Sequence, residues 1–80
     1  MPATATDVQA TVTEALESFG AEPSDINRDA TMESLDIDSL DLAELSQIAE
    51  EKYGVTLKST DADRLKTVGD AIDLIVERAG

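Results

Sequence analysis

The stretch from residue 38 to residue 54, DSLDLAELSQIAEEKYG, predicts a helix whose two ends are both marked in the sequence. Asp38 suits the N-cap position, and Asp41 stands three residues later, as a capping box requires. Gly54 is the residue type that most often ends a helix in the left-handed conformation. The apolar residues that recur at helical spacing, and that we expect to be buried, are Leu42, Leu45, Ile48, Ala49 and Tyr53.

The part of the chain before this helix divides into another helix and a long loop. Apolar residues at helical spacing predict a helix over about residues 6–19. Thr6 with Gln9 fits a capping box at its start, and Gly20 is a suitable end. Residues 20–37 show no clean period and predict a loop, which is long for a compact domain. The apolar side chains that we expect to pin this loop to the core are Ile26, Met32, Leu35 and Ile37.

Two more helical segments are predicted after Gly54. Thr67, with Asp70 three residues later, marks the start of a last helix. A short helix is expected over about residues 61–65, capped by the run Ser59-Thr60-Asp61 and held to the core by Leu65. No segment alternates with a period of two for long enough to predict a strand. We therefore expect an all-α fold, a four-helix bundle of three longer helices and one short helix, with residues 1–80 as a single domain.

The composition excludes several classes of function. The chain has 80 residues, 18 of them acidic and 6 basic, so its net charge is −12, and it lacks Cys, His and Trp. There is thus no disulfide framework, no thiol nucleophile and no imidazole proton shuttle. The longest apolar run, residues 74–76, is far shorter than the roughly 20 residues of a membrane span. The first residues do not resemble a signal peptide, so we expect a cytoplasmic protein. The acidity argues against nucleic acid and anionic membranes as partners.

The net negative charge is concentrated in the middle of the chain. No basic residue occurs between Arg28 and Lys52, whereas several acidic residues do. Asp41, Glu44 and Glu51 fall near one side of the predicted helix, with Glu50 beside them. Such a run is consistent with a solvated helix surface. It is also consistent with a docking surface for cationic partners, whose arrival it would accelerate.

Ser39 lies in the first turn of the same helix, where an attached phosphate would be favoured by the helix dipole. The surrounding run, LDIDSLD at residues 35–41, closely resembles the attachment motif of acyl carrier proteins. Two further segments resemble that family, EEKYGV at 50–55 and LKTVGDAI at 65–72, and the likeness covers about residues 32–76. It implies an acyl-carrier-protein-like four-helix bundle. It also implies that Ser39 carries 4′-phosphopantetheine, transferred from coenzyme A.

The resemblance implies a carrier rather than an enzyme, with no catalytic residues and no metal site. The arm would hold acyl groups as thioesters and deliver them to separate fatty-acid or polyketide synthase enzymes. The implied partners are a phosphopantetheinyl transferase, acyl or malonyl transferases and a ketosynthase, with basic docking patches on their surfaces. We expect a monomer. Together with the helix face, the resemblance predicts the following partner-recognition residues: Asp38, Leu40, Asp41, Ala43, Glu44, Gln47, Glu50, Glu51 and Asp63.

The sequence departs from the family pattern in ways that leave the pathway open. Asp36 stands where many members have Gly, and Ser46 and Gln47 are polar where fatty-acid carriers usually have apolar residues. A peptidyl or aminoacyl carrier is an alternative, and so is an acidic helical interaction module without a prosthetic group. A calcium-binding loop counted from Asp36 lacks the required residues at its fifth, sixth and twelfth positions, so the EF-hand pattern fails.

Overall fold

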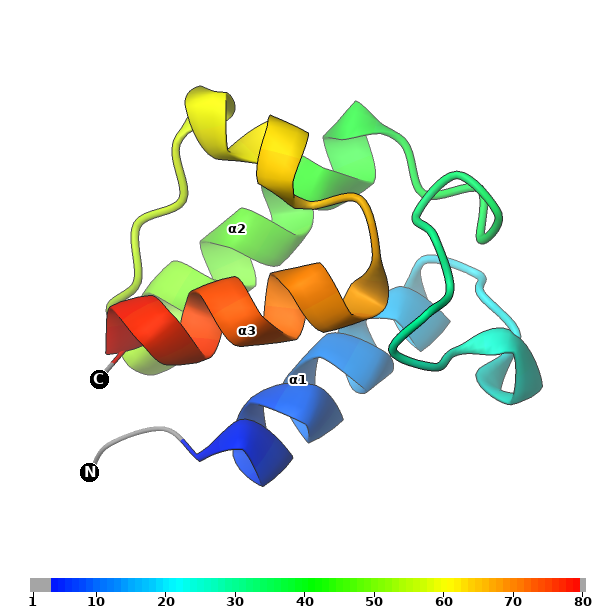
Figure 1. The fold of residues 1–80 in the computed structure, drawn as a ribbon, viewed down its shortest axis with the longest axis horizontal. Coiled ribbons are helices and arrows are strands. Elements are labelled where there is room, and N and C mark those ends of the chain that lie inside the picture. Colours follow the sequence, from blue (N-terminus) through cyan, green and yellow to red (C-terminus); the bar gives the residue numbers. More distant parts are fainter. Residues whose placement is uncertain (1–3, 80) are drawn as a thin grey trace.

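The computed structural model describes residues 4–79, apart from the side chains of residues 59, 60 and 62. It contains the α-helices α1 (Ala5–Ser18), α2 (Ser39–Tyr53) and α3 (Val68–Ala79), and the 3₁₀ helices η1 (Pro23–Asp25) and η2 (Ser59–Arg64) (Figure 1). α1 and α3 form the closest helix pair and run in opposite directions. The prediction of an all-α fold with three longer helices is confirmed.

The start of α1 differs from the sequence-based expectation. The N-cap is Thr4, whose hydroxyl accepts a hydrogen bond of 3.1 Å from the backbone N–H of Asp7. The predicted capping box at Thr6 and Gln9 is therefore wrong, because both residues lie within the helix. The Thr4 start also places the Asp7 carboxylate in the first turn, where the helix dipole favours a negative charge.

The capping predicted for the other two helices is confirmed. Asp38 accepts a hydrogen bond of 2.9 Å from the N–H of Asp41, and the Asp41 carboxylate accepts from the N–H of Asp38 at 3.4 Å. The same reciprocal pair forms between Thr67 and Asp70, at 3.0 and 3.1 Å. Gly54 ends α2 with φ at 67°, in the left-handed region. Both helices thus begin with donors that are satisfied locally.

The predicted short helix is present only as the 3₁₀ helix η2, Ser59–Arg64, and not as an α-helix over residues 61–65. Asp61 lies inside η2, and its carboxylate accepts a hydrogen bond of 2.8 Å from the N–H of Lys58. The expected capping by Ser59 and Thr60 falls on side chains outside the described residues. A six-residue segment gains few helical hydrogen bonds, so tertiary contacts decide its geometry.

The long loop between α1 and α2 is held by backbone hydrogen bonds as well as by apolar side chains. The N–H of Met32 donates to the carbonyl of Lys66, and the N–H of Val68 donates to Ala30, both at 2.9 Å. The N–H of Gly69 donates to the carbonyl of Arg28 at 3.0 Å. Of the predicted apolar anchors, Met32, Leu35 and Ile37 are buried and Ile26 is partly buried. The loop is therefore fixed against the start of α3 and holds the beginning of α2.

The core is aliphatic and is built from all three α-helices. α2 contributes fewer fully buried residues than α1 or α3, only Leu45 and Ala49, whereas Leu42, Ile48 and Tyr53 are partly buried. In its first turn, Ser39 and Leu40 are exposed, and Asp41 and Leu42 are partly buried. Within residues 4–79, no helix combines the length and the apolar character needed to cross a membrane. The largest fully buried side chains are Leu16, Leu45, Ile72, Leu74 and Ile75.

Candidate functional site

Ser39 is the first residue of α2, and its side chain is exposed. Among the described residues, its hydroxyl forms no hydrogen bond, whereas the neighbouring Asp38 carboxylate is occupied by the N–H of Asp41. The capping box therefore fixes the backbone on which Ser39 stands and leaves the hydroxyl free. The arrangement presents an accessible nucleophilic oxygen at the positive end of a helix.

A groove opens directly beside Ser39. We call it the α2–η2 groove, because one wall is α2 and the opposite wall is formed by residues that flank η2, Leu57 and Lys58 before it and Leu65 after it. Its volume is about 380 Å³. The hydroxyl of Ser46 lines it and donates a hydrogen bond of 3.0 Å to the carbonyl of Leu42. The lining residues are Ser39, Leu42, Ala43 and Ser46 on α2, and Leu57, Lys58 and Leu65 on the opposite wall.

The opposite wall of the groove is held by an ion pair between η2 and α3. The Arg78 guanidinium donates hydrogen bonds of 2.6 and 2.7 Å to the two carboxylate oxygens of Asp61, and a third of 3.1 Å to the carbonyl of Thr56. Asp61 is buried. Its hydrogen bonds with Arg78 and with the N–H of Lys58 lower the pKa of this carboxyl to about 2. Asp61 thus remains charged at neutral pH and links residues 56–61 to α3.

The predicted recognition residues on α2 lie on one outward surface. Leu40 is 76% exposed, and no other large apolar residue is exposed in the described part of the chain. We call the set Leu40, Ala43, Glu44, Gln47, Glu50 and Glu51 the α2 outer face, and all six side chains are exposed. Asp41 is half-buried, and Asp38 is exposed at the N-cap. Asp63 is exposed but lies on η2, apart from this face.

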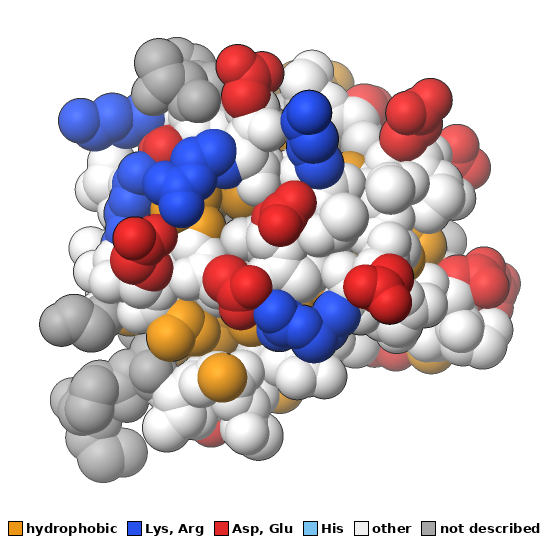
Figure 2. Space-filling model, viewed as in Figure 1, with side chains coloured by type: hydrophobic (Ala, Val, Ile, Leu, Met, Phe, Trp, Pro, Cys, Tyr) orange, Lys and Arg blue, Asp and Glu red, His pale blue; other side chains and the backbone are white. Residues whose placement is uncertain are grey.

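The acidic side chains of the α2 outer face have no ion-pair partner among the described residues. The three ion pairs among the described residues lie elsewhere and involve the three arginines: Arg28 with Asp73, Arg64 with Glu77 and Arg78 with Asp61. Figure 2 shows the face that carries α3 and η2, where basic side chains are interleaved with acidic ones. The negative charge of α2 is therefore left available to an external cation.

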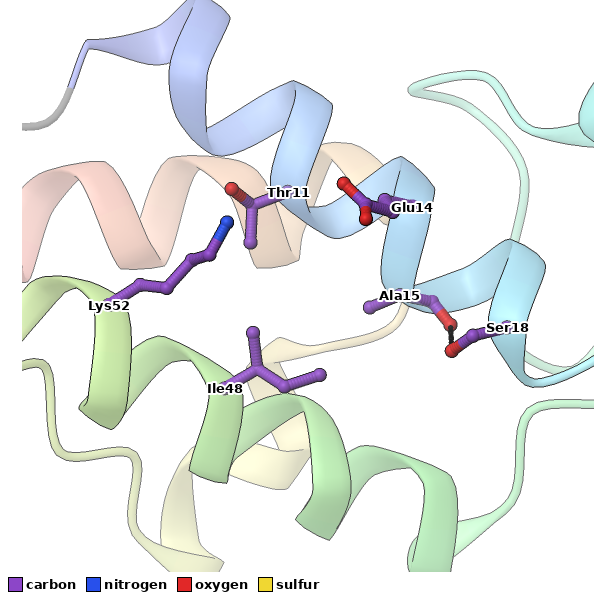
Figure 3. Close-up of a pocket in the computed structure, with 6 residues that line it drawn as sticks. All are labelled: Thr11, Glu14, Ala15, Ser18, Ile48 and Lys52. Atoms are coloured by element: carbon purple, nitrogen blue, oxygen red, sulfur yellow. Dashed lines mark hydrogen bonds between the residues drawn. The ribbon is translucent and has the colours of Figure 1, made fainter.

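A second cavity lies between α1 and α2 and is separate from Ser39. Its volume is about 160 Å³. Figure 3 shows the Lys52 side chain extending from α2 toward Thr11 on α1, with Ile48 on the α2 side. The hydroxyl of Ser18 at its edge donates to the carbonyl of Ala15 at 2.6 Å. This cavity contains no predicted site residue.

The comparisons with known proteins agree with this geometry. The family described as the phosphopantetheine attachment site matches residues 7–75. The acyl carrier protein of Chlamydia trachomatis serovar D is 42% identical over 73 residues, which cover 90% of this chain and 91% of the relative. The chain belongs to the acyl carrier protein family. The meromycolate extension acyl carrier protein of Mycobacterium bovis is 39% identical over 77 residues, which cover 94% of this chain and 67% of that protein.

Membership in the family gives the acyl carrier protein its general role. It is a carrier and not an enzyme, and its prosthetic group is phosphopantetheine. This role implies interaction with synthase and transferase enzymes. The sequence had predicted the carrier role from the segments around Ser39, Gly54 and Val68.

The groove was not predicted from the sequence. Leu65 was expected only as a core anchor, and Leu57 and Lys58 were not candidate site residues. Their place opposite Ser39 depends on how η2 packs, which is a non-local property. The polarity of Ser46 was the one local signal that this side of α2 is unusual.

Proposed function

We propose that 4′-phosphopantetheine is attached to Ser39 and that this acyl carrier protein presents acyl thioesters on that arm to separate synthase enzymes. The observation that supports this most directly is the exposed and unbonded Ser39 hydroxyl at the start of α2. A phosphodiester there would be favoured by the free N–H groups and the dipole of the helix.

The other serines whose side chains the structure describes compare poorly with Ser39 as attachment points. The hydroxyls of Ser18, Ser34 and Ser46 donate to backbone carbonyls at 2.6, 2.8 and 3.0 Å. Ser24 is exposed, but it lies in the three-residue helix η1, which offers no comparable helix start. The preference for Ser39 thus follows from accessibility combined with a full-length helix.

We further propose that the α2 outer face is the docking surface for the partner enzymes. Leu40 would form its apolar centre, and Glu44 would meet basic residues of a partner. The partners must leave after each transfer, so a small charged contact is well suited to this role, because charge accelerates arrival and the small area permits departure. The proposed partners are a phosphopantetheinyl transferase, acyl or malonyl transferases and a ketosynthase.

The α2–η2 groove is the proposed shelter for the part of the acyl chain next to the thioester. Leu42, Leu57 and Leu65 give it apolar walls, and it begins at Ser39. In this arrangement η2 takes the place of the short third helix of the family's four-helix bundle, which is the fold that we propose for the chain. Tethering beside the groove would keep the cargo at a high effective concentration.

Intact-mass measurement tests the attachment. The apo protein is incubated with coenzyme A and a broad-specificity phosphopantetheinyl transferase. The unaltered chain should gain the mass of one arm, Ser39→Ala should gain none, and the matched control Ser24→Ala should gain one. A mass gain in Ser39→Ala, or no gain in the unaltered chain, would overturn the assignment.

A further inference from the structure

We propose that Lys58 is a positioning residue for the prosthetic arm. Its ammonium group pairs with the phosphodiester on Ser39 and directs the arm into the α2–η2 groove. This inference rests on the attachment to Ser39 proposed above, and it adds a residue that neither the family pattern nor the comparisons assign.

The first argument is placement. Ser39 and Lys58 line the same groove from opposite walls, Ser39 on α2 and Lys58 on the segment that leads into η2. A phosphate attached to the Ser39 oxygen would therefore stand at the α2 edge of the groove, across from a flexible lysine side chain. In the part of the chain that the structure describes, Lys58 is the basic residue that lines this groove.

The second argument is the use made of the other cations. Arg28, Arg64 and Arg78 are engaged with carboxylates at 2.8, 3.3 and 2.6 Å. Lys52 lines the separate cavity between α1 and α2. Lys66 forms no ion pair with a described residue either, but it is not among the residues that line the groove. Lys58 forms no ion pair with any described residue, so its charge is free for an anion that the polypeptide itself does not supply.

The third argument is that the backbone of Lys58 is held firmly although its side chain is exposed. Its N–H donates to the Asp61 carboxylate at 2.8 Å, and its carbonyl accepts from the N–H of Asp61 at 2.9 Å. Asp61 is in turn bound by Arg78. Both backbone polar groups of Lys58 are thus fixed through a residue that is itself anchored to α3.

The charge balance at the start of α2 explains why such a cation is useful. A phosphodiester adds one negative charge beside Asp38 and Asp41, in a chain whose net charge is already −12. Lys58 offsets that repulsion on the groove side, whereas the α2 outer face is acidic and repels the arm. An exposed ion pair is weak and is screened by salt. Lys58 therefore biases the arm toward the groove and still lets it swing out to an enzyme.

Backbone amide NMR shifts on loading the arm test the proposal. Apo and holo forms of the unaltered chain, Lys58→Gln, Lys58→Arg and the control Lys66→Gln are compared, with loading verified by intact mass. The holo forms carry a free thiol, so no carboxylate on a cargo contributes. In the unaltered chain, loading should shift the amides of Leu57 and Leu65 as well as those beside Ser39.

Lys58→Gln should reduce the loading shifts of the Leu57 and Leu65 amides by at least about twofold, the scale expected for a weak exposed ion pair. The loading shifts of the amides beside Ser39 should stay unchanged. Lys58→Arg and Lys66→Gln should match the unaltered chain, and about 0.5 M NaCl should abolish the difference. Equal shifts in Lys58→Gln, or shifts insensitive to salt, would overturn the role of Lys58 alone. Failure of Ser39 to gain mass would instead overturn the attachment on which it rests.

Discussion

Arg78, in the last turn of α3, binds Asp61 in η2 through two hydrogen bonds of 2.6 and 2.7 Å. The same guanidinium reaches the carbonyl of Thr56. This contact ties the non-helical wall of the α2–η2 groove to the best-packed helix of the domain. A second, exposed ion pair joins the same elements, between Arg64 in η2 and Glu77 in α3 at 3.3 Å.

We expect Arg78→Met to make the stability of the protein less dependent on acid pH. The pKa of Asp61 is about 2 in the folded protein, below the value of about 3.9 expected when unfolded. Its stabilisation is therefore complete above the unfolded pKa and is lost as the pH falls through the folded pKa. Urea denaturation should show that the unaltered protein has a higher free energy of unfolding than Arg78→Met. This difference should be largest near neutral pH and should shrink between about pH 5 and 2.

Arg64→Met is the matched control for this measurement. Its ion pair with Glu77, at 3.3 Å, is exposed on both sides. Such a pair contributes less than about 1 kcal/mol, so the control should lie close to the unaltered protein at every pH. A constant difference between Arg78→Met and the unaltered chain across the acid range would contradict the role of Asp61.

Charge reversal on the α2 outer face should slow modification by a phosphopantetheinyl transferase. We expect Glu44→Lys to lower kcat/KM for transfer of the arm by about tenfold at low salt, and by less at high salt. Glu17→Lys makes the same charge change on the exposed surface of α1 and should have little effect. Equal rates for both variants would show that α2 is not the docking surface.

Leu40→Ala should impair the same transfer without changing the fold. Leu40 is 76% exposed and contributes little to the core, so its removal should leave the denaturation midpoint unchanged. Loss of an apolar contact at the centre of the interface should lower kcat/KM for transfer of the arm about tenfold, which corresponds to roughly 1.4 kcal/mol. Transfer at the unaltered rate would remove Leu40 from the docking surface.

Gly69→Ala should destabilise the protein even though alanine favours helices. A Cβ at position 69 would lie 3.0 Å from the carbonyl oxygen of Arg28, which the Gly69 N–H already holds. We expect a loss of about 1–3 kcal/mol from this overlap. In an unhindered helix the same change would raise the free energy of unfolding by up to about 1 kcal/mol. A lower denaturation midpoint would therefore support the overlap with Arg28, and a higher midpoint would contradict it.

Ile72→Ala should lower the free energy of unfolding by about 2–5 kcal/mol, because it leaves a cavity in the core. Ile72 is 1% exposed on the buried side of α3. Ile48→Ala, at a partly buried position, should show a smaller loss. If the two variants had equal denaturation midpoints, the assignment of Ile72 to the centre of the core would be wrong.

The features that could be predicted from the sequence are those decided within a few residues. The capping pairs at Asp38 and Thr67 depend on partners three residues away, so spacing alone revealed them. The start of α1 was misplaced because Thr4 and Thr6 each have a suitable partner three residues later. Among the site residues, Ser39 was predicted from the resemblance of residues 35–41 to the attachment motif, and the α2 outer face from that resemblance together with the register of one helix.

Long-range placement could not be predicted. The hydrogen bonds that join Arg28 and Met32 to the start of α3 link residues far apart in the sequence, and no local pattern indicates them. The same holds for the groove, whose second wall depends on the pair between Asp61 and Arg78. Asp36 has φ at 57°, in the region that favours glycine. This conformation explains the glycine that the family resemblance indicates there, a reason that the sequence alone did not reveal.

The asymmetry of the two groove walls has a consequence for cargo size. One wall is a continuous α-helix, whereas the other flanks the short 3₁₀ helix η2, which is joined to α3 by the ion pairs of Asp61 with Arg78 and of Arg64 with Glu77. Local opening of a short segment with few buried contacts generally requires less free energy than the unfolding of a packed helix. Outward movement of this wall would enlarge the proposed acyl-chain groove. One small domain would then accommodate acyl chains of different lengths without any change in its aliphatic core.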